Sequence, residues 1–249
     1  AARNCVLRDR DGLEIWGWPG EWEPTTHWMR NTMYLSWDLP RPNWAHVEQR
    51  DFLAMERWAR ETGTPLGGMY FDNISGYSIR EFDYRRDHRA YARSPLVVAV
   101  DPPEPAQAKV LQLCEFLPRF RDIVHEHGGF IIGNFNGAAG WQLAQHFDFI
   151  GVESYKANVI EQLRAMAGTR PASYLVHGAD RDVFENCLRY AVAPGFLSSN
   201  LEARDLYREY MPLIVELGEA GWRPVPHARH SDDGAQVERF GGFSAGTLS

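Results

Sequence analysis

Two acidic residues of this chain each end a short apolar run. Asp72 ends GGMYFD, and Glu153 ends FDFIGVE. Cleavage of a glycosidic bond commonly needs two carboxyl groups, one that donates a proton and one that attacks the anomeric carbon or activates water. A separation of about 5–5.5 Å implies a covalent intermediate, and about 6.5–9.5 Å implies inversion. The alternative is that each acid only caps a strand end or binds an arginine.

Polar and aromatic residues near these acids could hold a sugar. Hydrogen bonds from Asn73, Tyr70 or backbone donors would keep Asp72 ionised. A partly apolar setting between Val152 and Tyr155 would favour a protonated Glu153. Amides can bond sugar hydroxyls, and indole rings can stack on sugar faces. A turn role for the second asparagine of FIIGNFNG and a structural role for the histidine of SYLVHG stay open. The predicted substrate-binding residues are Trp37, Asp38, Asn73, Asn134, Asn136, Tyr155, Lys156 and His177.

Other kinds of catalytic site have less support. A metal at His177, His227 or His230 would make the chain a metal-dependent barrel hydrolase. His227 and His230 stand near Asp232 and Asp233, but a solvated turn also explains this group, because no ligand beyond these is placed nearby in sequence. The sequence contains no GxSxG motif, which would indicate a serine nucleophile. No glycine-rich loop follows a predicted strand, which weakens the case for a nucleotide-binding site. We therefore expect no metal and no cofactor.

Helical and strand patterns alternate from residue 44 onward. This alternation predicts βαβ units and a parallel sheet, and runs such as FIIG, FIGV and SYLV are typical of strands buried on both faces. Residues 73–105 are expected to be irregular. The final helix is expected to be capped by Ser199 or Asn200. Strands are predicted at 67–72, 130–137, 147–154, 171–178 and 191–196, and helices at 44–61, 109–127, 138–146, 159–167, 180–190 and 201–220.

Polar residues at successive strand ends favour a barrel, in which catalytic groups lie at the C-terminal ends of the strands. Alternate barrel strands point side chains into the same layer, so Asp72 and Glu153 would face each other across a pocket. A closed barrel needs eight strands, and residues 5–37 could add one or two to the five. We therefore expect an α/β fold, a partial TIM-type (β/α) barrel with roughly strands 3–8, in a chain that is a fragment.

The expected organisation has three parts. Residues 1–43 form an aromatic-rich segment of the barrel, and residues 44–222 form barrel units with the catalytic strand ends. Residues 223–249 form an extended segment with turns. The aromatic residues before position 60 suit either a sugar-stacking cleft or the packing of an irregular segment.

Several motifs together resemble those of barrel glycoside hydrolases of the dextranase, endo-α-N-acetylgalactosaminidase and α-galactosidase-like groups. The motifs are GMYFDNISGYS, FIIGNFNG, FDFIGVES, the strand ending in His177 and WRPVPHARHSDDGAQVERFG, within residues 65–241. The resemblance implies that Asp72 is the nucleophile and Glu153 the acid/base of a retaining reaction on an α-linked glycan. It also implies that the tail leads into an all-β domain.

Composition limits the choice of partners. The net charge is −7, and the Arg-rich stretch at 80–93 alternates with acids, so we expect no nucleic-acid partner. The sequence has no apolar run of about 18 residues, so it predicts no membrane-spanning helix. Three widely spaced cysteines predict neither a zinc site nor a disulfide framework. The expected partner is an oligosaccharide, polysaccharide or glycoconjugate substrate, and a non-catalytic carbohydrate-binding barrel relative is the alternative. Compartment and oligomeric state stay open.

Overall fold

The computed structural model describes residues 5–14, 36–39, 43–74, 82–99, 103–135, 141–153, 159–176, 180–196, 203–225 and 237–242. The chain separates into two compact units. Unit 1 comprises Ala1–Ile132 and Gly140–Phe147, and unit 2 comprises Gly133–Ala139 and Asp148–Ser249.

Five strands form one parallel sheet, which confirms the predicted α/β class. The strands are β1 (Gly68–Phe71), β5 (Phe130–Phe135), β6 (Phe149–Glu153), β7 (Ala172–Val176) and β8 (Ala193–Phe196). Their order in the sheet is β1-β5-β6-β7-β8, so the described strands do not close into a barrel. All five were predicted, because each is a short apolar run between a turn and a helix.

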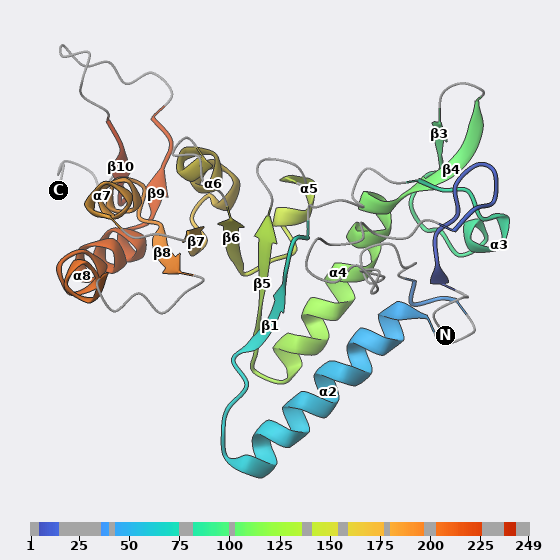
Figure 1. Cartoon of the computed structure of the whole chain (residues 1–249), viewed down its shortest axis with the longest axis horizontal. Helices are drawn as coiled ribbons and strands as arrows, with labels where there is room; N and C mark the ends of the chain where they lie inside the picture. The colour runs from blue at the N-terminus through green and yellow to red at the C-terminus, as the bar shows by residue number, and fades with distance from the viewer. Residues whose placement is uncertain are drawn as a thin grey trace. The chain divides into compact units, whose positions relative to one another are not determined.

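Two long helices dominate unit 1, α2 (Trp44–Thr62) and α4 (Lys109–Glu126), and they lie side by side (Figure 1). Asn43 caps α2 through its side chain, which accepts a hydrogen bond from the Ala45 N–H at 2.8 Å. Between the helices the rings of Phe52 and Phe120 pack edge to face, with centroids 6.1 Å apart. Both predicted helices are confirmed, because their apolar faces and stop signals are strong.

A small antiparallel sheet lies where the sequence predicts an irregular segment. Its strands are β2 (Phe82–Asp83), β3 (Val97–Ala99) and β4 (Glu104–Ala108), in the order β2-β4-β3, and helix α3 (Arg86–Arg89) follows β2. The irregular prediction for residues 73–105 was therefore wrong. The strands are two to five residues long and β4 contains a proline, so pairing rather than local pattern specifies them.

Other boundaries also differ from the predictions. Helix α5 (Trp141–Ala144) is shorter than the predicted 138–146. The last long helix, α8 (Arg204–Ala220), begins after the predicted start at 201, and no side chain caps it. Ser199 and Asn200 lie outside the described residues. Residues 5–14 form an isolated bridge between Arg8 and Glu14 and no further strand of the large sheet.

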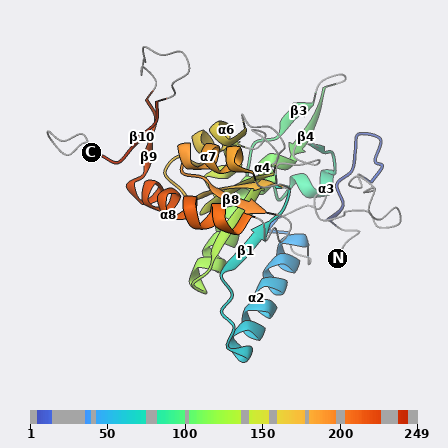
Figure 2. The same ribbon diagram turned by 60° about the vertical axis from the view of Figure 1, so that its left-hand side comes forward.

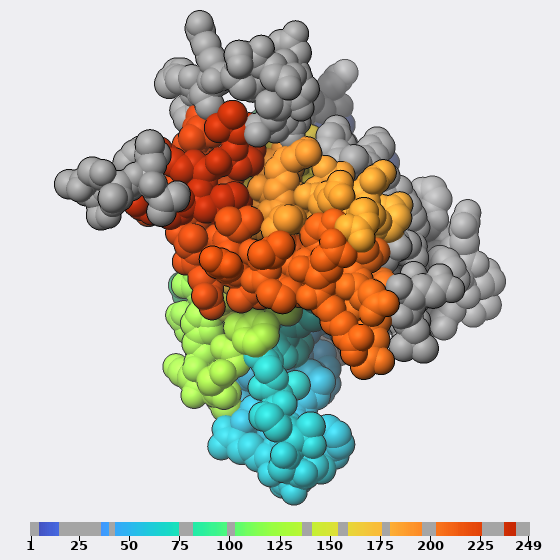
Figure 3. All heavy atoms as spheres, turned by 90° about the vertical axis from the view of Figure 1, so that its left-hand side faces the viewer, coloured from blue at the N-terminus to red at the C-terminus, as the bar shows by residue number. Residues whose placement is uncertain are grey.

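Unit 2 packs three helices against β6, β7 and β8. They are α6 (Val159–Ala167), α7 (Arg181–Arg189) and α8, and α7 lies beside α8 (Figure 2). Arg181 on α7 pairs with Glu209 on α8 at 2.8 Å, and Figure 3 shows the two helices, in orange, packed together at the surface. Residues of the predicted extended tail form a short antiparallel pair, β9 (Trp222–Arg223) and β10 (Arg239–Phe240).

The two faces of the sheet in unit 2 differ in burial. The residues of one face are buried, namely Ile150, Val152, Ala172, Tyr174 and Pro194. The residues of the other face are largely half-buried and mostly small, namely Gly151, Glu153, Ser173, Leu175, Ala193 and Gly195. The alternation indicates that the first face packs under the helices and that Glu153 stands on the second. No described helix is long and apolar enough to cross a membrane.

Candidate functional site

Glu153 is the last residue of β6 and is half-buried. Its neighbour along the strand, Val152, is fully buried on the opposite face. The Nδ2 of Asn134 on β5 donates a hydrogen bond to Glu153 Oε2 at 3.4 Å. Asn134 is only 2% exposed. The structure therefore brings together two of the predicted site residues, and it holds the carboxyl group at the C-terminal end of a parallel strand.

Asp72 directly follows β1 and is exposed. The hydroxyl of Tyr70, one of the donors considered from the sequence, donates a hydrogen bond to Asp72 Oδ1 at 3.1 Å. Asn73 has a φ of 50°, in the left-handed region that asparagine tolerates well. At the start of the strand, a Cβ on Gly68 would lie 1.8 Å from the carbonyl oxygen of Phe130, so glycine is needed for this close approach.

The two proposed catalytic acids belong to different units, Asp72 to unit 1 and Glu153 to unit 2. The structure describes each carboxyl group with its own hydrogen-bond donor from the same unit. Four further residues that the sequence predicts for the site lie outside the described part of the chain. They are Asn136, Tyr155, Lys156 and His177.

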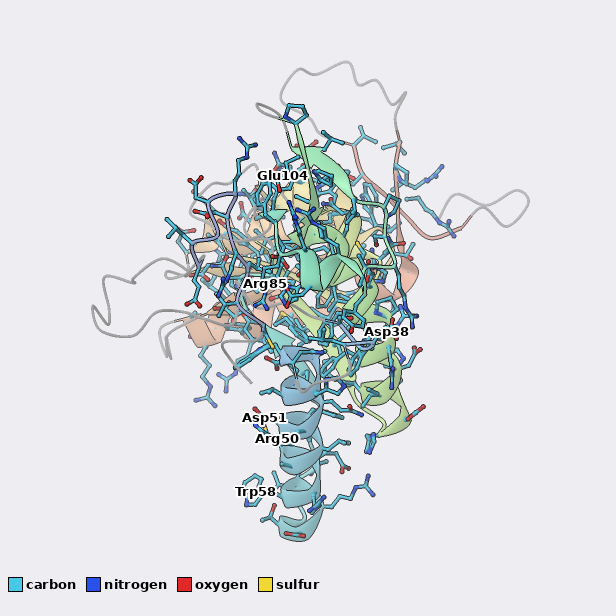
Figure 4. All side chains as sticks on the ribbon, turned by 90° about the vertical axis from the view of Figure 1, so that its right-hand side faces the viewer. Asp38, Arg50, Asp51, Trp58, Arg85 and Glu104 are labelled. Carbon is cyan, nitrogen blue, oxygen red and sulfur yellow. The ribbon has the colours of Figure 1, made fainter. Side chains whose placement is uncertain are left out.

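Trp37 and Asp38 lie against other parts of unit 1. The indole of Trp37 stacks on Phe116 with centroids 5.4 Å apart, and the guanidinium of Arg119 lies 4.6 Å from the ring centroid. Asp38, labelled in Figure 4, accepts a hydrogen bond from Arg93 Nη2 at 2.7 Å. This bond lowers the pKa of the Asp38 carboxyl. Both side chains are therefore in contact with other residues of unit 1, and these contacts hold residues 36–39 in place.

A second group of ionisable residues, unforeseen from the sequence, is buried in unit 1. Asp83, His88 and Lys109 are each at most 1% exposed. His88 Nδ1 lies 2.5 Å from Asp83 Oδ2, and Asp83 Oδ1 accepts the backbone N–H of Arg8 and of Arg85 at 3.4 and 3.2 Å. Burial lowers the pKa of Lys109 to about 7, although the charge of Asp83 opposes this shift.

This buried group joins several segments of unit 1. The Tyr84 N–H donates to the Arg8 carbonyl at 3.0 Å, and Arg85 Nη1 donates to the Val6 carbonyl at 3.2 Å. Asp83 and Gln107 are cross-strand partners of β2 and β4. The group therefore fastens residues 5–14 onto β2. Lysine side chains are almost always exposed, so the sequence does not predict that Lys109 is buried. Its burial follows from the tertiary packing.

Replacing Lys109 with methionine is expected to stabilise unit 1 most at low pH. The folded-state pKa of about 7 lies below the ordinary lysine pKa of 10.5, so the unfolded chain binds more protons between these two pH values. The stability of the wild type should therefore rise with pH across this window, and it should be lowest below about pH 7. We expect Lys109→Met to gain on the order of 3 kcal/mol near pH 6, and little near pH 10.

Urea unfolding at several pH values measures this difference. Arg50→Met, which removes a charge from an exposed side chain of α2, is the matched control and should leave the pH dependence unchanged. Equal pH slopes for the wild type and Lys109→Met would show that Lys109 does not titrate in this way.

The described part of the chain contains no cluster of side chains that could bind a metal ion. There, no group of three or more His, Cys, Asp or Glu residues could hold a metal ion. His177, His227 and His230, the histidines considered for a metal, lie outside the described residues. No disulfide joins the three cysteines, all of which lie among the described residues.

Comparison with known proteins adds no further argument. No family model matches the chain, and neither the curated proteins nor the solved structures gave a match.

Proposed function

We propose that this chain carries the catalytic residues of a retaining glycoside hydrolase that acts on an α-linked glycan. The observation that carries the proposal is the setting of Glu153, a half-buried carboxyl group at the end of β6 that receives a hydrogen bond from a buried amide. A strand-end carboxyl group with a fixed polar partner suits an acid/base catalyst. Asp72, exposed and hydrogen-bonded by Tyr70 after β1, is the proposed nucleophile.

The proposed reaction has two steps. In the first, an Asp72 oxygen attacks the anomeric carbon while the bond to the leaving oxygen breaks, and Glu153 gives its proton to that oxygen. In the second, the Glu153 carboxylate takes a proton from water, whose oxygen attacks the same carbon and releases Asp72. The two displacements retain the anomeric configuration, and Glu153 ends protonated as it began.

The proposed reaction sets the distance between the two carboxyl groups. A retaining reaction requires the carboxyl groups of Asp72 and Glu153 to come within about 5–5.5 Å of each other in the active enzyme. The proposal also includes a finer fold assignment, in which the parallel sheet is part of a TIM-type barrel. Supporting this, both acids stand at the C-terminal ends of strands of one parallel sheet, the edge at which barrel enzymes carry their catalytic groups.

A panel of chromogenic aryl glycosides, of both anomeric configurations and several sugars, tests the activity. We expect turnover of at least one α-glycoside, with the α-anomer of the sugar as the first product in a proton NMR time course. A β-anomer as first product would contradict the retaining mechanism. Saturable sugar binding without any turnover would instead favour a non-catalytic carbohydrate-binding relative, and activity lost on chelation would favour a metal-dependent hydrolase.

A further inference from the structure

Asn134 occupies a position that differs from that of an ordinary sugar-binding side chain. It lies on β5, within unit 2, and is 2% exposed, so nearly all of its surface contacts protein. Its Nδ2 points to Glu153 Oε2 at 3.4 Å. An amide that donates to a carboxylate oxygen from inside the protein restricts the rotation of that carboxyl group.

Gly151 on the neighbouring strand lies beside this contact. A Cβ added to Gly151 would lie 3.9 Å from Asn134 Oδ1 and 3.8 Å from Asn134 Cα. Gly151 and Glu153 are two residues apart on β6, so they stand on the same face of the sheet. The amide of Asn134 therefore lies next to Gly151 and reaches the carboxyl group of Glu153 on the same strand.

We infer that Asn134 is a positioning residue for Glu153, which orients the carboxyl group and selects the oxygen that carries its proton. The catalytic part of this inference rests on the proposed function. Nδ2 can only donate, and the carbonyl-type oxygen of a carboxylic acid accepts better than its hydroxyl oxygen. Oε2 is therefore favoured as the oxygen without the proton, which places the acidic proton of neutral Glu153 on Oε1. Oε1 then delivers the proton to the leaving oxygen, and Asn134 itself touches no reacting atom.

The replacement Asn134→Asp tests the inference with almost no change in side-chain shape. It removes the donor and sets a second acidic oxygen against Oε2, so the carboxyl group of Glu153 loses its orientation. We expect kcat/KM to fall about 10²-fold for substrates with poor leaving groups, the contribution typical of general acid catalysis. For dinitrophenyl glycosides, which need no protonation on departure, the change should stay within a few-fold. A merely structural role would lower both equally and would overturn the inference.

A second measurement does not depend on activity. In protein carrying ¹³C-labelled glutamate carboxyl groups, the Glu153 signal is assigned by its loss in Glu153→Gln, and its NMR titration curve should move in Asn134→Asp. The control Asn43→Asp makes the same change at another fully buried asparagine, which lies in unit 1, and should leave that curve in place. If Asn134→Asp does not fold, the uncharged Asn134→Ala takes its place, with the same expected split between leaving groups.

The outcomes separate the two claims. A moved titration curve in a protein that hydrolyses no glycoside would uphold the contact with Glu153 and reject the proposed function. An active wild type whose Glu153 titration and leaving-group dependence are unchanged in the variants would uphold the function and reject the role of Asn134.

Discussion

Asp72→Ala is expected to abolish hydrolysis, with kcat lowered by about 10³-fold or more, because no other group can form the glycosyl–enzyme bond. Melting temperature should change little, since Asp72 is exposed and follows the strand rather than packing within it. Added azide should restore turnover of an activated aryl α-glycoside. Since azide then attacks in place of the lost carboxylate, a single displacement occurs and the product should be the inverted β-glycosyl azide.

The matched control for this variant is Asp122→Ala, which removes an exposed carboxylate from α4 of the same unit. It should retain the wild-type kcat. Full activity in Asp72→Ala, or a glycosyl azide of retained configuration, would remove Asp72 from the role of nucleophile.

Glu153→Ala is expected to give a different pattern, which separates the two roles. Substrates with poor leaving groups should lose about 10²–10⁴-fold in kcat/KM, because they need a proton on departure. With dinitrophenyl glycosides the first step survives, the glycosyl–enzyme accumulates, and the steady-state rate is limited by its hydrolysis. Azide should accelerate that second step and give the retained α-glycosyl azide, because two displacements then occur at the same carbon.

Glu216→Ala, on the exposed surface of α8 in unit 2, serves as its control and should behave like the wild type. An equal loss for all leaving groups, with no response to azide, would argue against acid/base catalysis by Glu153.

Much of the large sheet could be predicted from the chain. Strands such as FIIG and FIGV are short continuous apolar runs between turns and helices, and the helices between them have clear apolar stripes and stop signals. Parallel strands also end at a common edge, so an acid that closes such a run is placed there by the topology alone. The sequence therefore predicts that Asp72 and Glu153 stand at this edge of the sheet.

The small antiparallel sheet could not be predicted in the same way. Its strands are too short to show alternation, and β4, EPAQA, contains residues with low strand propensity. The pairing of Asp83 with Gln107 depends on contacts across about two dozen residues of intervening chain, which local patterns do not encode. The burial of Lys109 follows from that pairing and was missed for the same reason.

The site itself was only partly accessible to sequence reasoning. Asn134 was predicted to bind sugar, but its burial and its bond to Glu153 depend on the alignment of β5 with β6 beside Gly151. Trp37 was predicted to stack on sugar, yet in the folded chain its ring stacks on Phe116 and lies under Arg119. In both cases a polar or aromatic residue type indicated an interaction, while only the packing identified the partner.

The most direct test of the two-carboxylate account is the identity of the residue that becomes bonded to the sugar. The wild-type enzyme is treated with an activated fluoro-sugar or cyclitol inactivator matched to its best substrate, digested, and mapped by tandem mass spectrometry. The account predicts one glycosylated residue, Asp72, in the peptide that contains GMYFDN. A label on any other residue, in a protein that turns over the corresponding glycoside, would contradict it.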